Sequence, residues 1–193
     1  MQTLKKFTSW LAIAAVLTIL TILAHEIAHF VGALLMGAEE IKLHWADVTY
    51  KENTLNAFGV AVTWLAGPFL THVIILCVWL GRASSVAALS LGLGACSRNL
   101  VLLPFTVNTL MGRDVSSFSG DEVRAAEALE AHPLPFALVA LALGVGGLIL
   151  FLTRAYRMGG MSQPIVLFIG TIVGIVLWNY VGPLLLPGGR GYS

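Results

Sequence analysis

The chain has 193 residues, of which 58% are hydrophobic and only 11% are charged, and its formal net charge is +1. A soluble domain carries about 25% charged residues, so this composition excludes an ordinary soluble protein and favours one integral membrane domain over residues 1–193. A net charge so close to zero gives no basic footprint for nucleic acid, and we expect no nucleic-acid partner.

The first membrane helix is predicted over about residues 7–36. At about 1.5 Å per residue, this segment is longer than a hydrocarbon core of roughly 30 Å, so it must tilt or protrude. Gly37 is a suitable residue to end the helix. Lys5 and Lys6 precede the apolar run as in a signal peptide, but the run is too long, and we expect a retained helix.

The second half of this helix contains an H-E-x-x-H motif formed by His25, Glu26 and His29. No charged residue occurs in 7–24 or in 27–38, so Glu26 lies where a charge is costly, and such a residue is a functional candidate. Residues four apart share one helix face, so the two imidazoles can bind one zinc ion while Glu26 acts as a general base. The alternative is a buried polar cluster that only joins helices.

Polar residues dominate 37–56, and apolar and polar residues alternate in 41–45 and 48–51. Alternation predicts two short strands and hence a small β-hairpin against the membrane. An exposed edge of this hairpin could pair with an extended peptide. His44 is either a fourth metal ligand or a solvated strand residue.

A second membrane helix is predicted over 57–80. Pro68 lies inside it, and a proline at membrane depth frees a carbonyl that neighbours or a cavity must satisfy. His72 follows one turn later, and we expect its side chain to face the interior of the bundle. There it would either support a metal ligand through a hydrogen bond or have a structural role.

The third membrane helix is predicted over about 86–104, with Arg98 and Asn99 in its middle. Arg98 can pair with a carboxylate or extend to the membrane interface. The polar region after this helix contains a short helix predicted for 121–130, with Ser119 as its N-cap.

Two further membrane helices are predicted over 136–153 and 164–186. Neither contains an acidic or basic residue, histidine included, so we expect them to support the rest. The prediction is therefore an all-α integral membrane protein with about five transmembrane helices and a β-hairpin insertion after the first. Within its single domain, residues 1–130 form the functional core and residues 131–193 the support.

Several motifs together resemble the site-2 protease family of intramembrane zinc metalloproteases. The family's G-P-x-x-N stretch is matched by 67–71, with Thr71 in place of Asn. Its N-x-x-P stretch is similar to 99–104, with two extra residues, and its D-G-G-R turn is similar to 121–124, where both glycines are replaced. The resemblance covers roughly residues 10–130.

The resemblance implies three zinc ligands, namely His25, His29 and Asp121. Asp114 is the rival for the third position. Glu26 would be the catalytic base, and Asn99 and Thr71 are candidates for binding substrate or its oxyanion.

The implied activity is that of a zinc metalloendopeptidase of regulated intramembrane proteolysis, in a multi-pass protein of the cell membrane. Its partners would be the lipid bilayer and a single-pass transmembrane protein substrate. One alternative is an inactive protease-like scaffold. A second is a small transporter or proton relay, but we find no internal repeat of the kind that would favour it.

Two orientations in the membrane stay open. Basic residues near the span ends favour a cytoplasmic N-terminus, which puts the H-E-x-x-H end of the first helix outside. The resemblance implies instead a catalytic centre nearer the cytoplasm.

Overall fold

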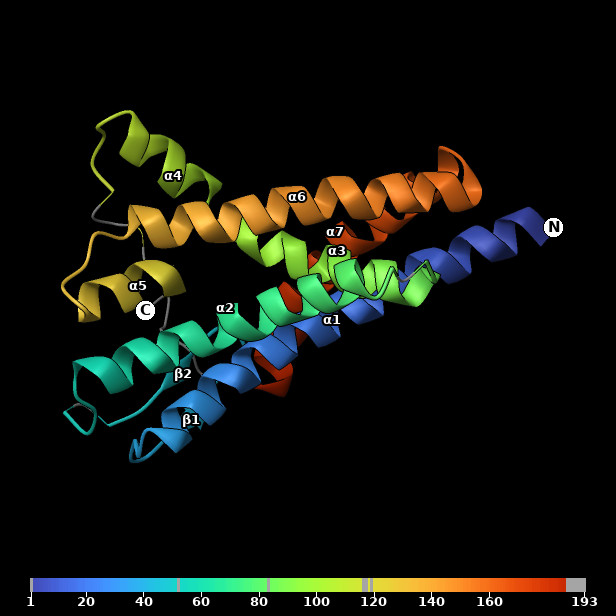
Figure 1. Ribbon diagram of the computed structural model, residues 1–193. Helices are drawn as coiled ribbons and strands as arrows, with labels where there is room; N and C mark the ends of the chain where they lie inside the picture. The colour runs from blue at the N-terminus through green and yellow to red at the C-terminus, as the bar shows by residue number, and fades with distance from the viewer. Residues whose placement is uncertain (1, 52, 83, 116–117, 119, 187–193) are drawn as a thin grey trace.

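The computed structural model describes residues 2–186 apart from 52, 83, 116, 117 and 119 (Figure 1). Within these residues the elements in chain order are α1 (Gln2–Leu35), β1 (Lys42–Leu43), β2 (Val48–Thr49), α2 (Ala57–Leu80), α3 (Val86–Leu100), α4 (Leu103–Leu110), α5 (Asp121–Ala128), α6 (Leu134–Gly159) and α7 (Ser162–Leu185). Five helical stretches are long and apolar enough to cross a membrane, one of them formed by α3 and α4 together. The predicted all-α membrane fold with a small hairpin is therefore confirmed.

The helix boundaries follow local chemistry. Gly37 ends α1 at a φ of 84°, a left-handed conformation that glycine adopts without strain. Asn56 caps α2, because its side chain accepts a hydrogen bond of 2.8 Å from the amide of Gly59. The predicted cap Ser119 lies outside the described residues, and the N-cap position of α5 is held by Gly120, which has no side chain to accept a hydrogen bond.

The third span is longer than its sequence suggested and is broken near its end. We expected it to end at Pro104, but that proline lies in the first turn of α4, which continues the apolar stretch to Leu110. Proline has no amide hydrogen and its ring clashes with the preceding turn, so it suits the start of a helix and not its interior. The chain therefore bends between α3 and α4.

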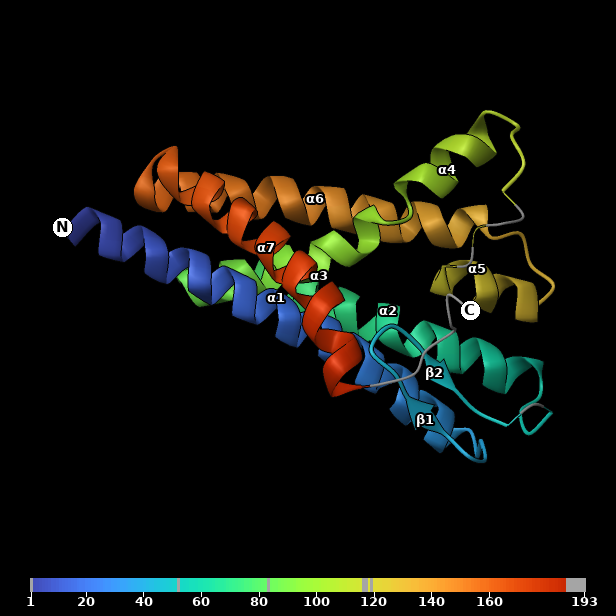
Figure 2. The same ribbon diagram turned by 180° about the vertical axis from the view of Figure 1, so that it is seen from behind.

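The hairpin consists of two short antiparallel strands, with Lys42 opposite Thr49 and Leu43 opposite Val48. It lies at the end of the bundle away from the N-terminus, on the same end as α5 (Figures 1 and 2). The indole nitrogen of Trp178 in α7 donates a hydrogen bond of 2.9 Å to the carbonyl oxygen of Trp45, in the hairpin turn. The last helix thus fixes the hairpin turn to the bundle.

Helix α1 packs against α2, α3 and α7. Small residues make these contacts close: a Cβ at Gly174 of α7 would lie 2.5 Å from the carbonyl oxygen of Ala15, and one at Gly94 of α3 would lie 3.0 Å from the Cα of Thr18. In lipid, association of helices depends on such close packing, because apolar side chains gain little by leaving the hydrocarbon.

Replacement of Gly174 by alanine should destabilise the bundle. The added methyl group forces α1 and α7 apart, and overpacking of this kind costs about 1–3 kcal/mol. The measurement is the free energy of unfolding in mixed micelles. Gly146→Ala in α6 is the control, since a Cβ there meets no atom of the described residues within 4 Å. Equal stability of the two variants would contradict the close α1–α7 contact.

Candidate metal centre

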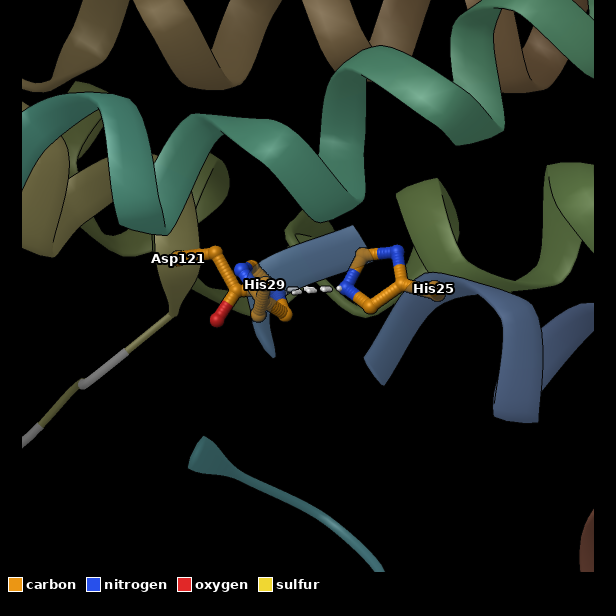
Figure 3. Close-up of side chains that lie close together, drawn as sticks. All are labelled: His25, His29 and Asp121. Carbon is orange, nitrogen blue, oxygen red and sulfur yellow. Dashed lines mark hydrogen bonds and ion pairs between the residues drawn. The ribbon is translucent and has the colours of Figure 1, made fainter. Parts of the chain in front are cut away.

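Three side chains from two distant segments meet at the hairpin end of the bundle (Figure 3). The Nε2 atoms of His25 and His29 lie 3.0 Å apart, and Oδ2 of Asp121 lies 2.9 Å from the first and 3.3 Å from the second. The histidines are 3% and 1% exposed and come from successive turns of α1, whereas Asp121 begins α5. These three groups could hold a metal ion.

Helix α2 fixes how the imidazoles are turned. Nδ1 of His29 lies 2.8 Å from the carbonyl oxygen of Thr63, and Nδ1 of His25 lies 2.9 Å from the hydroxyl oxygen of Thr71. A carbonyl oxygen only accepts hydrogen bonds, so the His29 ring carries a proton on Nδ1. When that ring is neutral, its Nε2 lone pair points toward Asp121.

This arrangement fits a cation. Nε2 of neutral His29 and the carboxylate of Asp121 both present lone pairs, and His25 does the same when its proton is on Nδ1. Lone pairs that converge within about 3 Å repel one another unless a proton or a metal ion lies among them. Hydrogen bonds to the distal ring nitrogens are also the usual support of metal-binding histidines.

The two acids at the start of α5 differ in their titration. Burial raises the pKa of Asp121, but its contacts with the imidazoles of His25 and His29 outweigh burial and hold the pKa well below its ordinary range. Burial raises the pKa of Glu122 to about 7, and the neighbouring charge of Asp121 adds to this effect. Asp121 is therefore the carboxylate that is ionised at neutral pH and available as a ligand.

Glu26, the predicted base, is 1% exposed and is held by an ion pair. Nη2 of Arg98 lies 3.1 Å from its Oε1 and 4.0 Å from Oδ2 of Asp121. Of the two roles considered for Arg98, the structure thus displays the pairing with a carboxylate. A cavity of about 180 Å³ opens beside these groups, and its lining includes His25, Arg98 and Asp121.

The two residues predicted to bind substrate both have partners within the protein. The amide nitrogen of Asn99 donates a hydrogen bond of 2.8 Å to the carbonyl oxygen of Ala140, and Thr71 contacts His25. Asn99 therefore ties α3 to α6, and Thr71 orients a ring. A contact of either residue with substrate stays a prediction.

Three other residues considered in the sequence lie outside the group. Asp114 does not belong to the described residues that converge on the two histidines. His44 directly follows β1 and contacts the hydroxyl of Thr49 across the hairpin at 2.9 Å, and it is not among the described residues that converge on the two histidines. His72 borders an apolar groove between α2 and α6, and its Nε2 is buried without a hydrogen-bond partner among the described residues.

The sequence did not reveal the role of Gly67. A Cβ at this position would collide with Nε2 of His29 and would lie 2.7 Å from Nε2 of His25. The glycine thus lets the backbone of α2 pass directly beside both imidazoles. The sequence signal for this role is the small pair Ala66-Gly67 directly before Pro68, at membrane depth.

Comparison of the chain with protein-family models, curated proteins and solved structures gives no match. The fold and the site define a helical, multi-pass membrane protein with a His–His–Asp group suited to a metal ion.

Replacement of Gly67 by alanine should displace both imidazoles and remove most of the bound metal, while the helical content is retained. The measurement is metal content per protein after purification. Gly59→Ala in the same helix is the control, because its nearest neighbours lie at an ordinary 3.4 Å. Full metal content in Gly67→Ala would contradict the contact.

Replacement of Thr71 by valine should lower metal affinity by about 10–100-fold, because His25 loses the partner that orients its ring. Competition with a chelator measures this change. Thr18→Val is the control: Thr18 is 0% exposed, and its hydroxyl has no hydrogen-bond partner in the part of the chain that the structure describes. If both variants bind metal equally, the hydroxyl of Thr71 does not support the site.

Proposed function

We propose that this protein is an intramembrane zinc metalloprotease that hydrolyses peptide bonds in or near transmembrane segments. One observation carries the proposal: His25, His29 and Asp121 converge beside Glu26, within helices apolar enough to lie in a membrane. Two imidazoles and one carboxylate are a ligand set that catalytic zinc uses, with a fourth position left for water.

Each protein group has a defined task in this proposal. His25, His29 and Asp121 would hold the ion, and Thr63 and Thr71 keep the rings turned toward its position. A Zn²⁺ ion held there would lower the pKa of a water molecule and polarise the substrate carbonyl. Glu26 accepts a proton from the attacking water and later gives it to the departing amine.

The surroundings favour a membrane-embedded substrate. The histidines lie within a transmembrane helix, where a folded soluble domain cannot reach them. A substrate helix hides its carbonyls in hydrogen bonds, so it must unwind locally, which glycine or proline makes easier. The hairpin beside the site offers a strand edge to the unwound segment. We infer that the substrate is a single-pass protein of the cell membrane.

Replacement of Glu26 by glutamine should lower cleavage of a designed single-pass substrate by at least about 100-fold while zinc is retained, because glutamine cannot accept the proton. Asp121→Ala should lose the metal as well as the activity, and Asp114→Ala should keep both. Metal analysis and cleavage in lipid vesicles measure these effects.

The same experiment separates the alternative functions. Zinc at one ion per chain without cleavage would favour the inactive scaffold. Absence of zinc together with ion movement across vesicles would favour the transporter. Loss of zinc in a well-folded Glu26→Gln variant would contradict the assignment of Glu26 as the base.

A further inference from the structure

Arg98 stands out among the residues that line the cavity beside the metal centre. It is the only lysine or arginine among the described residues of that lining. Its side chain is 29% exposed, whereas that of Glu26, its partner, is 2% exposed. The guanidinium thus reaches from a buried carboxylate into the open space of the site.

Arg98 is better placed to bind an anion than its neighbour Asn99, for which that role was predicted. The Asn99 amide nitrogen is used by the carbonyl of Ala140, and the residue is 2% exposed. A guanidinium has five N–H donors in a fixed plane, and a contact with Glu26 through Nη2 leaves others for the cavity. The same nitrogen lies 4.0 Å from Oδ2 of Asp121, so a substrate carbonyl at the metal centre would lie within its reach.

We propose that Arg98 is a catalytic residue that stabilises the negative charge formed on the substrate's carbonyl oxygen. This proposal rests on the protease function proposed above. It names the group of the chain that acts on the oxyanion of that same site.

Peptide hydrolysis at this site moves one proton and one negative charge. Glu26 takes a proton from the attacking water, a bond forms between the water oxygen and the carbonyl carbon, and the C=O electron pair moves to the carbonyl oxygen. The negative charge thus passes from Glu26 to that oxygen. The N–H groups of Arg98, which contact Glu26 before the reaction, can then donate hydrogen bonds to the charged oxygen. When the C–N bond breaks, the C=O bond re-forms and the amine nitrogen takes the proton from Glu26.

Replacement of Arg98 by methionine, which has a similar length and no charge, tests the proposal. Removal of one oxyanion donor costs about 10²–10³ in kcat, so we expect a fall of this size with little change in KM and full metal content. Arg98→Lys should recover part of the lost kcat, because lysine restores the positive charge but not the planar set of N–H donors of a guanidinium. Arg157→Met, an exposed arginine near the end of α6, is the control.

A binding measurement gives a second readout that does not depend on turnover. A phosphinic peptide with the substrate's sequence carries a tetrahedral anion in place of the scissile bond. Arg98→Met should weaken binding of this peptide by about the same factor as kcat, and binding of the uncleaved sequence, measured in a Glu26→Gln background, should stay within a few-fold.

The outcomes separate this proposal from the protease function. If the wild type cleaves and Arg98→Met retains full kcat, or binds the phosphinic peptide equally well, Arg98 is not the oxyanion group. If both Arg98 variants lose metal or melt early, its role is structural, and the proposal is overturned. If the wild type binds metal and cleaves nothing, both proposals fall together.

Discussion

The cost of placing polar groups inside an apolar helix bundle governs this structure. His25, Glu26 and His29 are nearly inaccessible to solvent, and an unpaired polar group in such surroundings costs several kcal/mol. Other segments satisfy all three: α2 and α5 contact both histidines, and Arg98 of α3 pairs with Glu26. The motif in α1 therefore dictates how three other elements must pack around it.

Glycine makes that packing possible. Gly67 lets α2 approach the imidazoles, Gly94 lets α3 approach α1, and Gly174 does the same for α7. Without these residues the helices would stand further apart, and the hydrogen bonds from α2 and the ion pair from α3 would be out of reach. The polar groups of α1 therefore find their hydrogen-bond and ion-pair partners only because the helices pack closely.

The short helix α5 completes the site from outside the five spans. Its first residue, Asp121, reaches the imidazoles, and Val123 and Ala126 of the same helix are buried. A carboxylate on a packed helix is held more firmly than one on a free loop. Residues 121–124 are helical and need no unusual backbone conformation, so this segment does not require glycine.

The sequence by itself determined the membrane class, the five spans, the hairpin and the histidine pair, because long apolar runs, alternation and helical spacing are local properties. It favoured Asp121 over Asp114, but spacing along the chain cannot measure distance in space. Only the tertiary structure decided that Asp121 meets the histidines, that Arg98 pairs with Glu26 and that Gly67 lies against the imidazoles. These contacts join residues 38 to 96 positions apart, and the packing of whole helices fixes them.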